Sequence, residues 1–522
     1  MGRFRSLTAR GLALLSHLTA PSIDAKSVAI EDALLERLTR REIDFSSLKH
    51  ITEDARDDAL IYGASSGTFK LNSTRDAHLF YTFFDRRGSG DGRASMNDSD
   101  DESPLIIWLT GGPGCASELA SLYENGPYAM ERDPKSGEAR LGRRAHAWND
   151  AGRLLYVDSP VGTGFSYTSK RADAARDETT VANDLLEFLS AFMLSRPELA
   201  DVEVYVTGES YAGHYVPAFA HRIFEANEKG DNPVRFNLRG VAIGNGLTEP
   251  AIQYGAYADY SLGNDIVDAK AAAEAMKAYP ACRKAIKACY RGDAGEKSNR
   301  ATCIRALNAC QIIPETLLEN AASRFDGKAI NVYDIRKSCD AELCYDFSAA
   351  EEWLNRADVQ KALGVNKKWE MCDNRVHSDM MGDWMHEYED MIPPLLEAGI
   401  RFMIYAGDQD FICNALGNER WVKAMKWSGR AAFNAEHPRP FVVSTSGDDE
   451  IIGGTVTESG KLSFVKVSQA GHMVPMDQPL NALTMIQRFV RGEPIARGDE
   501  TTPVRGAAPR RAVRDSLRVA SQ

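Results

Sequence analysis

The sequence predicts an α/β protein whose central sheet is mixed, mostly parallel and covered by helices on both faces. Strand-like apolar runs alternate with helical patterns along most of the chain. One run ends in a turn that carries Ser210 and opens a helix, and two later runs end in turns that carry Asp410 and His472. A serine, an acid and a histidine that each follow a strand indicate a catalytic site where distant loops converge.

Ser210 lies in the run GESYAG at 208–213, directly after the strand-like segment 202–206. This pattern sets a serine on a sharp turn between a strand and a helix, where a base and a substrate carbonyl can reach its hydroxyl. Ala212 stands where the commonest form has its second glycine, and its small side chain still lets the helix pack closely. The short pattern alone also fits an ordinary strand–loop–helix connection, so other segments must decide.

The serine hydroxyl needs an imidazole to take its proton and a carboxylate to orient that imidazole. Asp410 follows the strand-like segment 401–405, and His472 follows the strand-like segment 462–467. The chain order Ser, Asp, His is that of the α/β-hydrolase fold. The sequence therefore predicts a triad of Ser210, Asp410 and His472 on this fold.

Two further residues compete for these roles. Asp408 follows the same strand as Asp410, and spacing alone does not separate them, although we favour Asp410. His214 is the histidine nearest to Ser210 in the sequence, four residues further along the predicted helix. We expect it to point sideways along that helix and to have a structural role.

Acyl transfer also needs hydrogen-bond donors that face the developing oxyanion. Segment 105–115 indicates a buried strand that runs into a glycine-rich turn, where missing side chains let backbone amides approach a ligand. The amides of Gly112 and Tyr211 are the natural pair, because this fold combines the residue after the nucleophile with a loop amide from an earlier strand. Taken alone, the segment also fits a plain Gly-Pro turn.

Four longer segments resemble the serine carboxypeptidases: WLTGGPGC at 108–115, DSPVGTGFSY at 158–167, GESYAGHYVP at 208–217 and GHMVP at 471–475. The resemblance extends from about residue 69 to about residue 490 and is greatest to the carboxypeptidase Y-like class and its plant class III relatives. It implies an exopeptidase that removes one C-terminal amino acid at a time at acidic pH, through an acyl-enzyme. We expect no cofactor. Between about residues 249 and 346 the pattern becomes helical, alanine-rich and cysteine-bearing, which indicates a cap inserted over the site.

The resemblance further implies that the substrate carboxylate is bound by Trp108, Thr110, Gly111, Glu124 and Glu209. Two neighbouring glutamates share a proton, so one of them can donate a hydrogen bond to the substrate carboxylate. We therefore predict that peptide affinity falls as the pH rises past roughly 6. Thr110 replaces the asparagine usual in the family, and a hydroxyl offers one donor where an amide offers two.

Two other functions are compatible with the same scaffold. Related acyltransferases use sugar-ester donors with the same triad, but they often carry aspartate beside the nucleophile, so Glu209 favours the peptidase. A catalytically silent binding or protective protein is the second alternative. The intact set of Ser210, Asp410 and His472 argues against it, because loss of function would be expected to break the triad first.

The nine cysteines indicate disulfides, because no C-x-x-C pair or zinc-like His-Cys cluster occurs, and we expect no metal. Four of them, at 282, 289, 303 and 310, are spaced symmetrically, as in a stapled helical hairpin, although the sequence alone allows three connectivities. With the resemblance, the pairs expected are Cys282–Cys310, Cys289–Cys303, Cys339–Cys344 and Cys115–Cys372.

Cys413 is the odd cysteine, three residues after the candidate acid. An unpaired cysteine is most often a small buried hydrophobic residue. The resemblance instead implies a free thiol beside the substrate pocket, to which we also assign Met473. Bulky mercurials are then expected to inhibit by blocking the thiol.

Composition limits the partners and the compartment. With 522 residues, 43% of them hydrophobic, the chain can bury one large core with an inserted subdomain, and a net charge of −12 argues against nucleic acid. No apolar run approaches the ~18 residues that span a bilayer. We expect peptide or protein C-termini as substrates and the secretory pathway, vacuole, lysosome or extracellular space as the location. Homodimers are common in the resembling family, and the sequence does not decide this point.

The predicted organisation has a charged leader that resembles a signal peptide and propeptide, a core in two halves, a cap and a basic disordered tail. The leader covers residues 1–68, the first half of the core 69–248, the cap 249–346, the second half of the core 347–490 and the tail 491–522. Asn72 and Asn97 are glycosylation acceptors. Segment 88–103, rich in Gly, Ser and Asp, is expected to form an exposed insertion in a hairpin loop.

Overall fold

The computed structural model describes seven ranges of the chain: 25–71, 76–88, 102–290, 299–321, 328–339, 341–445 and 449–496. Both predicted glycosylation acceptors, Asn72 and Asn97, lie outside these ranges. The same holds for most of the predicted insertion at 88–103, for the start of the predicted leader and for nearly all of the predicted tail.

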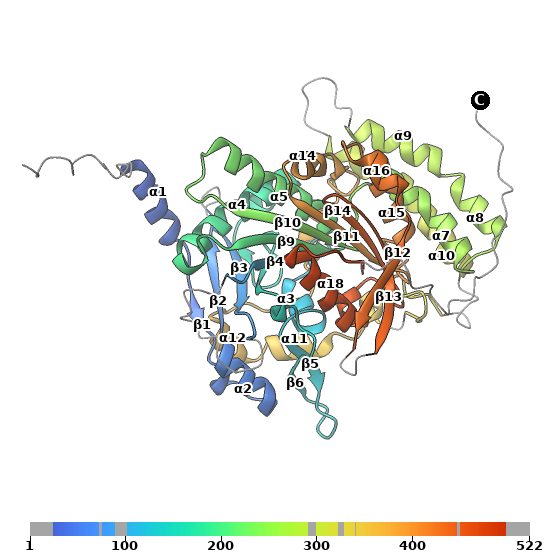
Figure 1. The fold of residues 1–522 in the computed structure, drawn as a ribbon. Coiled ribbons are helices and arrows are strands. Elements are labelled where there is room, and N and C mark those ends of the chain that lie inside the picture. The colour runs from blue at the N-terminus through green and yellow to red at the C-terminus, as the bar shows by residue number, and fades with distance from the viewer. Residues whose placement is uncertain are drawn as a thin grey trace, which may run out of the picture.

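A twelve-stranded sheet forms the centre of the fold, in the order β1-β2-β3-β7-β4-β9-β10-β11-β14-β13-β12, with β8 beside β3 (Figure 1). The two remaining strands, β5 and β6, form a separate two-stranded sheet. The six central strands from β7 to β14 are parallel, and the strands beyond them on both sides are antiparallel. The strands are β1 (Arg41–Glu42), β2 (Ala64–Lys70), β3 (Ala77–Phe84), β4 (Leu105–Thr110), β5 (Tyr128–Arg132), β6 (Ala139–Arg143), β7 (Arg153–Asp158), β8 (Tyr167–Thr168), β9 (Glu203–Glu209), β10 (Asn237–Gly244), β11 (Arg401–Gly407), β12 (Arg439–Ser444), β13 (Glu450–Ser459) and β14 (Leu462–Val467).

Helices follow most of these strands. They are α1 (Ala25–Leu35), α2 (Glu53–Tyr62), α3 (Ser117–Tyr123), α4 (Glu178–Leu194), α5 (Ala212–Lys229), α6 (Pro250–Gln253), α7 (Tyr257–Gly263), α8 (Ala269–Met276), α9 (Tyr279–Tyr290), α10 (Arg300–Ala321), α11 (Ser348–Leu354), α12 (Ala357–Leu363), α13 (Asn374–Met380), α14 (Ile392–Glu397), α15 (Ala415–Ala424), α16 (Arg430–Ala435), α17 (Val474–Asp477) and α18 (Pro479–Arg491). Short 3₁₀ turns occur at Phe45–Ser47, Trp148–Asp150, Arg171–Asp173, Pro197–Leu199, Tyr254–Ala256, Glu342–Cys344 and Glu389–Met391.

The central strands are buried on both faces, so their residues alternate between two apolar clusters. In β4, Ile107 faces the cluster that also contains residues of α4 and α5, whereas Ile106 and Trp108 face the cluster that contains residues of α3 and α18. Successive side chains of a strand point to opposite faces of the sheet. Helices therefore cover both faces, as predicted, and the structure confirms the α/β-hydrolase type of architecture.

The sheet begins earlier in the chain than the predicted boundary at residue 69. Strand β2 (Ala64–Lys70) pairs with β3 along its whole length, and Phe45 and Leu48 before it are also buried. The strand escaped the sequence analysis because its residues ASSGTFK are small and polar although nearly all are buried, so they lack the alternation that marks a strand. At the other end, the amides of Ile495 and Ala496 donate to the carboxylate of Glu458.

The segment between β10 and β11 contains the helical insertion. Helices α7 to α10 lie together on one side of the sheet (Figure 1). Two disulfides, Cys282–Cys310 and Cys289–Cys303, join α9 to α10, and the other two are Cys115–Cys372 and Cys339–Cys344. These are the pairs that the resemblance implies. No helix in the described ranges combines the length and hydropathy needed to cross a bilayer.

Candidate active site

Ser210 lies between the end of β9 and the start of α5, on the predicted turn. Its backbone φ of +67° is in the left-handed region that side-chain-bearing residues rarely adopt. The turn is held by hydrogen bonds from the Ser210 amide to the Gly244 carbonyl and from the Leu247 amide to the Ser210 carbonyl, each 3.0 Å long. Such a conformation persists only where the surrounding structure fixes it, and it presents the serine at the carboxyl end of the sheet.

Asp410 follows β11 and is fully buried. Its carboxylate accepts hydrogen bonds from Nδ2 of Asn245 at 2.8 Å and from the amides of Ile412 and Cys413, both at 3.1 Å. A fourth donor is the imidazole of His472, whose Nδ1 lies 2.9 Å from Asp410 Oδ2. The four donors fix the orientation of the carboxylate and place one of its oxygens against Nδ1 of His472.

His472 follows β14 and is 4% exposed. Its amide donates to the carbonyl of Tyr333 at 2.7 Å, and the Tyr333 ring lies 5.2 Å from the imidazole. Because Asp410 engages Nδ1, Nε2 is the ring nitrogen left for proton transfer. Ser210 and His472 are both described, and no direct hydrogen bond joins their side chains. Catalytic hydrogen bonds often form only in the substrate complex.

The structure separates the competing candidates. Asp408 Oδ1 accepts hydrogen bonds from the backbone amide of Gln469 at 2.9 Å and from Nε2 of Gln409 at 3.0 Å. Asp408 therefore anchors the loop before His472. His214 is buried, with Nδ1 2.6 Å from the carbonyl of Leu247, and burial lowers its pKa to about 4. Neither residue contacts the His472 imidazole. Because Asp410 does contact it, the geometry favours Asp410 over Asp408 as the acid.

The glycine-rich turn after β4 packs against the start of α5. A Cβ added to Gly111 would lie 2.4 Å from the backbone nitrogen of Tyr211 and 2.8 Å from Cβ of Ser210. Gly112 has a φ of +112°, which only glycine adopts without strain. Glycine thus allows the approach of the two loops that carry the predicted oxyanion donors, the amides of Gly112 and Tyr211.

The predicted carboxylate-binding residues also meet at this edge. Thr110 and Glu209 are register partners at the ends of β4 and β9. The indole of Trp108 donates from Nε1 to Thr110 Oγ1 at 3.0 Å, so the threonine hydroxyl keeps its own proton for another acceptor. Residues 108–111 and Glu209 therefore lie directly beside Ser210.

Glu124 and Glu209 form a buried carboxyl pair. Burial raises the pKa of Glu124 to about 7, and a side-chain hydrogen bond with Glu209 opposes this rise. The pKa of Glu209 is raised well above its usual range by burial and then by the charge of Glu124 and their hydrogen bond. The Oε2 atoms of Glu124 and Glu209 have no hydrogen-bond partner among the described residues. Both carboxyl groups therefore favour the protonated form more than an exposed glutamate does, and each has an oxygen without a partner among the described residues.

Cys413 is a buried free thiol, and burial raises its pKa well above the usual range, with further contributions from the charges of Asp410 and Glu209. Met473 packs in a small apolar cluster with Leu119 and Phe347. Both predicted pocket residues thus flank the acid and the base.

Asn245 is a site residue that the sequence analysis missed. Its Nδ2 donates to Asp410, its Oδ1 accepts from the amide of Gly407 at 3.1 Å, and its φ is +39°. The signal was available in the run Gly244-Asn245-Gly246, a polar residue between glycines directly after β10. Without the neighbouring strand β11, nothing in that run indicates a partner for its amide.

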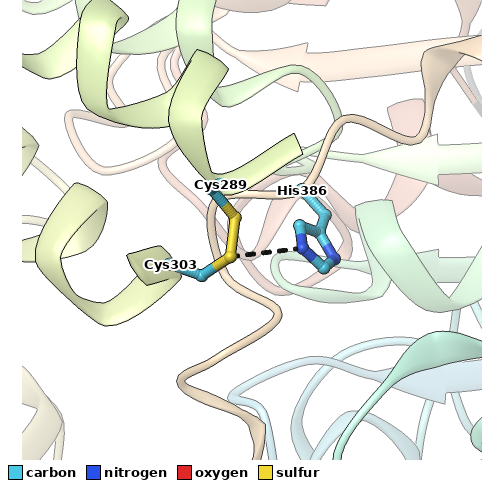
Figure 2. Close-up of side chains that lie close together, drawn as sticks. All are labelled: Cys289, Cys303 and His386. Carbon is cyan, nitrogen blue, oxygen red and sulfur yellow. Dashed lines mark hydrogen bonds between the residues drawn. A yellow bond between two sulfur atoms is a disulfide. The ribbon is translucent and has the colours of Figure 1, made fainter. Parts of the chain in front are cut away.

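One group of potential metal ligands occurs among the described residues: Cys289, Cys303 and His386. The two cysteines are joined in a disulfide, and His386 Nε2 lies 3.6 Å from Cys303 Sγ (Figure 2). Sulfur atoms in a disulfide are not thiolates, which are the form that binds metal. In this state the group is therefore a disulfide with a histidine beside it.

The mixed, mostly parallel sheet with its helices defines a class of protein, the α/β-hydrolases. A family model described as serine carboxypeptidase matches residues 58–492. The chain belongs to the serine carboxypeptidase family and is a serine-type carboxypeptidase.

Individual relatives agree with this assignment. The chain is 44% identical over 445 residues to serine carboxypeptidase-like 49 of Arabidopsis thaliana, covering 85% of this chain and 80% of that protein. It is 43% identical over 432 residues to serine carboxypeptidase 3 of Oryza sativa subsp. japonica, covering 83% and 80%. The crystal structure of Kex1Δp, a prohormone-processing carboxypeptidase from Saccharomyces cerevisiae, is similar in fold with a TM-score of 0.73, at 24% identity, covering 87% of this chain and 96% of that one.

Proposed function

We propose that this carboxypeptidase hydrolyses the last peptide bond of peptides and proteins at acidic pH, with Ser210, His472 and Asp410 as the triad. Ser210 Oγ attacks the scissile carbonyl while Nε2 of His472 takes its proton, and Asp410 stabilises the resulting imidazolium. The amides of Gly112 and Tyr211 bind the oxyanion. His472 then protonates the leaving amino acid, and water releases the peptide from the acyl-enzyme by the reverse proton transfers.

The observation that carries the proposal is the Glu124–Glu209 pair directly before the nucleophile. An exopeptidase must recognise a free carboxylate, and an ionised pair would repel it. Because both pKa values are raised, the pair keeps a proton at acidic pH and uses it to donate a hydrogen bond to the substrate carboxylate. In this role Trp108, Thr110 and Gly111 complete the binding site on the neighbouring strand end.

The test compares blocked dipeptides with a free C-terminal carboxylate against the same dipeptides amidated at the C-terminus, at about pH 5 and about pH 8. We expect rapid release of the last amino acid from the free acid at about pH 5 and at least tenfold slower cleavage of the amide, roughly the effect of one lost charged hydrogen bond. Equal cleavage of both forms would contradict the proposed carboxylate site.

A second incubation separates the alternative functions. The protein is given a glucose ester and an alcohol acceptor, and labelling with diisopropyl fluorophosphate is measured in parallel. Acyl transfer without peptide cleavage would identify an acyltransferase. Failure of the reagent to label Ser210 would indicate a silent binding protein. Ser210→Ala is the matched control, because it removes only the oxygen that the reagent modifies.

The pocket assignment of Cys413 and Met473 has a separate test. We propose that a mercurial on the Cys413 thiol blocks the substrate, since the Cys413 amide donates to Asp410 and the charge of Asp410 contributes to the raised pKa of the thiol. Inhibition by a bulky mercurial should be lost in Cys413→Ser. A variant that stays equally sensitive would remove Cys413 from the pocket.

The four disulfides support a location in the secretory pathway, the vacuole, the lysosome or the extracellular space. We further propose that α7 to α10 form a cap that shapes the substrate site, and that a leader is removed before β2. Mass spectrometry of protein purified from its native source would test the second point. A mature N-terminus beyond residue 70 would contradict it, because β2 ends there.

A further inference from the structure

Asp383 is a buried acid outside the proposed triad and carboxylate site. It lies after α13 and is 1% exposed. Its carboxylate accepts from the hydroxyl of Tyr388 at 3.0 and 3.1 Å, from Nδ1 of His386 at 3.0 Å and from the hydroxyl of Tyr211 at 3.3 Å. The first two donors belong to its own loop, whereas Tyr211 belongs to the turn of the nucleophile.

Tyr211 supplies one of the two proposed oxyanion donors through its backbone amide. Its side chain is almost fully buried, with the ring stacked on His214 at 4.5 Å and lying 5.2 Å from Trp384. Burial raises the pKa of the Tyr211 phenol well above its usual range, so the hydroxyl stays a neutral donor. Ser210, directly before Tyr211, has a φ of +67°, a conformation that persists only where the surrounding structure holds the turn. The hydrogen bond from the Tyr211 hydroxyl to Asp383 is one contact that holds it.

His386 extends this network to the inserted helices. Its Nδ1 contacts Asp383, and its Nε2 faces Cys303 Sγ of the disulfide that joins α9 to α10 (Figure 2). The chain of contacts therefore runs from the Tyr211 hydroxyl through Asp383 and His386 to the disulfide. It connects the turn of the nucleophile with the insertion through buried side chains and the half-buried His386.

We propose that Asp383 is a positioning residue for the oxyanion hole: it holds the Tyr211 hydroxyl and thereby the aim of the Tyr211 amide, and through His386 it ties that amide to the disulfide-linked helices. The proposal rests on the proposed function, because it takes the Tyr211 amide as an oxyanion donor. A displacement of about 1 Å in a catalytic group costs up to about a hundredfold in rate, so a fixed amide matters. Asp383 itself touches no reacting atom.

The first test compares two variants that each remove one hydroxyl from the same carboxylate. Tyr211→Phe removes the bond to the turn of the nucleophile, and Tyr388→Phe removes a bond within the Asp383 loop. We expect kcat for a blocked dipeptide to fall about tenfold in Tyr211→Phe with KM unchanged, less than the roughly hundredfold cost of a whole oxyanion donor. Tyr388→Phe should stay within about twofold of the wild type.

A purely structural role would lower the stability of both variants without separating their kcat values. Thermal unfolding is therefore measured for each. Equal kcat values for the two variants, or a rise in KM without a fall in kcat, would overturn the proposal. Asp383→Leu keeps roughly the size of the side chain but removes both acceptor oxygens, and its effect on kcat should not add to that of Tyr211→Phe, because both break the same contact. Full additivity would also contradict the proposal.

The second test does not depend on peptide specificity. Diisopropyl fluorophosphate phosphorylates Ser210 Oγ with loss of fluoride, and the phosphoryl oxygen then needs the oxyanion donors. The rate of labelling should fall about tenfold in Tyr211→Phe and stay near the wild-type rate in Tyr388→Phe. If the wild type is labelled but cleaves no peptide, the proposed function fails while the labelling rates still decide the role of Asp383. If Ser210 is not labelled at all, both proposals fail.

Discussion

Two groups of buried acids at the same edge of the sheet have opposite surroundings. Asp410 accepts four hydrogen bonds, from Asn245, two backbone amides and His472. Glu124 and Glu209 instead face each other, and each has an oxygen without a partner among the described residues. Hydrogen-bond donors surround Asp410, whereas Glu124 and Glu209 lie acid beside acid, an arrangement that favours a shared proton.

The difference shows how one environment prepares two chemical roles. An anion at Asp410 can orient His472 and stabilise its charged form during catalysis. A protonated pair at Glu124 and Glu209 can bind the anionic end of a peptide. Burial is common to both groups, so the neighbouring donors and acceptors decide the role and not the depth in the protein.

Asp410→Asn would break the first group with the largest effect. The amide keeps the shape but presents a donor to Nδ1 of His472, which imposes the wrong tautomer on the imidazole. We expect kcat to fall about 10⁴-fold, measured on a blocked dipeptide at its optimal pH. Asp408→Asn is the matched control, since Asp408 follows the same strand without contacting His472. A similar loss in both variants would contradict the assignment of Asp410.

The stability of the protein should depend on pH through the second group, Glu124 and Glu209. The pKa of Glu124 is about 7 in the folded protein against an ordinary value of 4.5, so the folded state holds a proton that the unfolded state has released between these values. The free energy of unfolding should therefore fall as the pH rises from 4.5 to about 7, by about 3 kcal/mol from this group.

Urea unfolding of the wild type and of Glu124→Gln at several pH values measures this effect. The glutamine cannot titrate, so the curve of the variant should be flatter across the same window. Buried acids that do not interact with Glu124 contribute equally to both proteins and cancel in the difference, whereas Glu209, whose pKa the charge of Glu124 raises, adds to it. Parallel curves for the two proteins would show that Glu124 does not hold a proton in the folded state.

Loss of the same proton should also weaken substrate binding, with a smaller effect than on stability. For a free-acid dipeptide, KM of the wild type should rise at least about tenfold between about pH 5 and about pH 8, because the pair becomes anionic. In Glu124→Gln the group that titrates near 7 is absent, so KM should change less than about threefold. An amidated dipeptide serves as the control. The same pH dependence of KM in both proteins would exclude the pair as the cause.

The smallest expected effect concerns Thr110, which supplies one donor beside the pair. Thr110→Asn adds a second donor near the substrate carboxylate, and we expect KM for a free-acid dipeptide to fall about two- to fivefold with kcat unchanged. The comparison with the amidated dipeptide isolates the contact. Unchanged KM would mean that the Trp108–Thr110 hydrogen bond already fixes the donor that the substrate uses.

Local patterns in the sequence determined the fold class and the turn of the nucleophile. The run around Ser210, the order of Ser, Asp and His, and the glycine-rich turn at 111–112 each depend on residues close in the chain, where sterics and backbone geometry act directly. The structural match confirms the fold class. Strand β2 was the exception, because its burial arises from neighbouring strands and not from its own apolar residues.

Only the tertiary structure separated Asp410 from Asp408, and only it revealed Asn245 and Asp383. Asn245 meets Asp410 across 165 residues of chain, and Tyr211 meets Asp383 across 172. Such contacts depend on which strands are neighbours and on their register, and spacing along the chain carries neither. The sequence thus determined which kinds of groups are present, while the packing of distant segments decided which donor faces which acid.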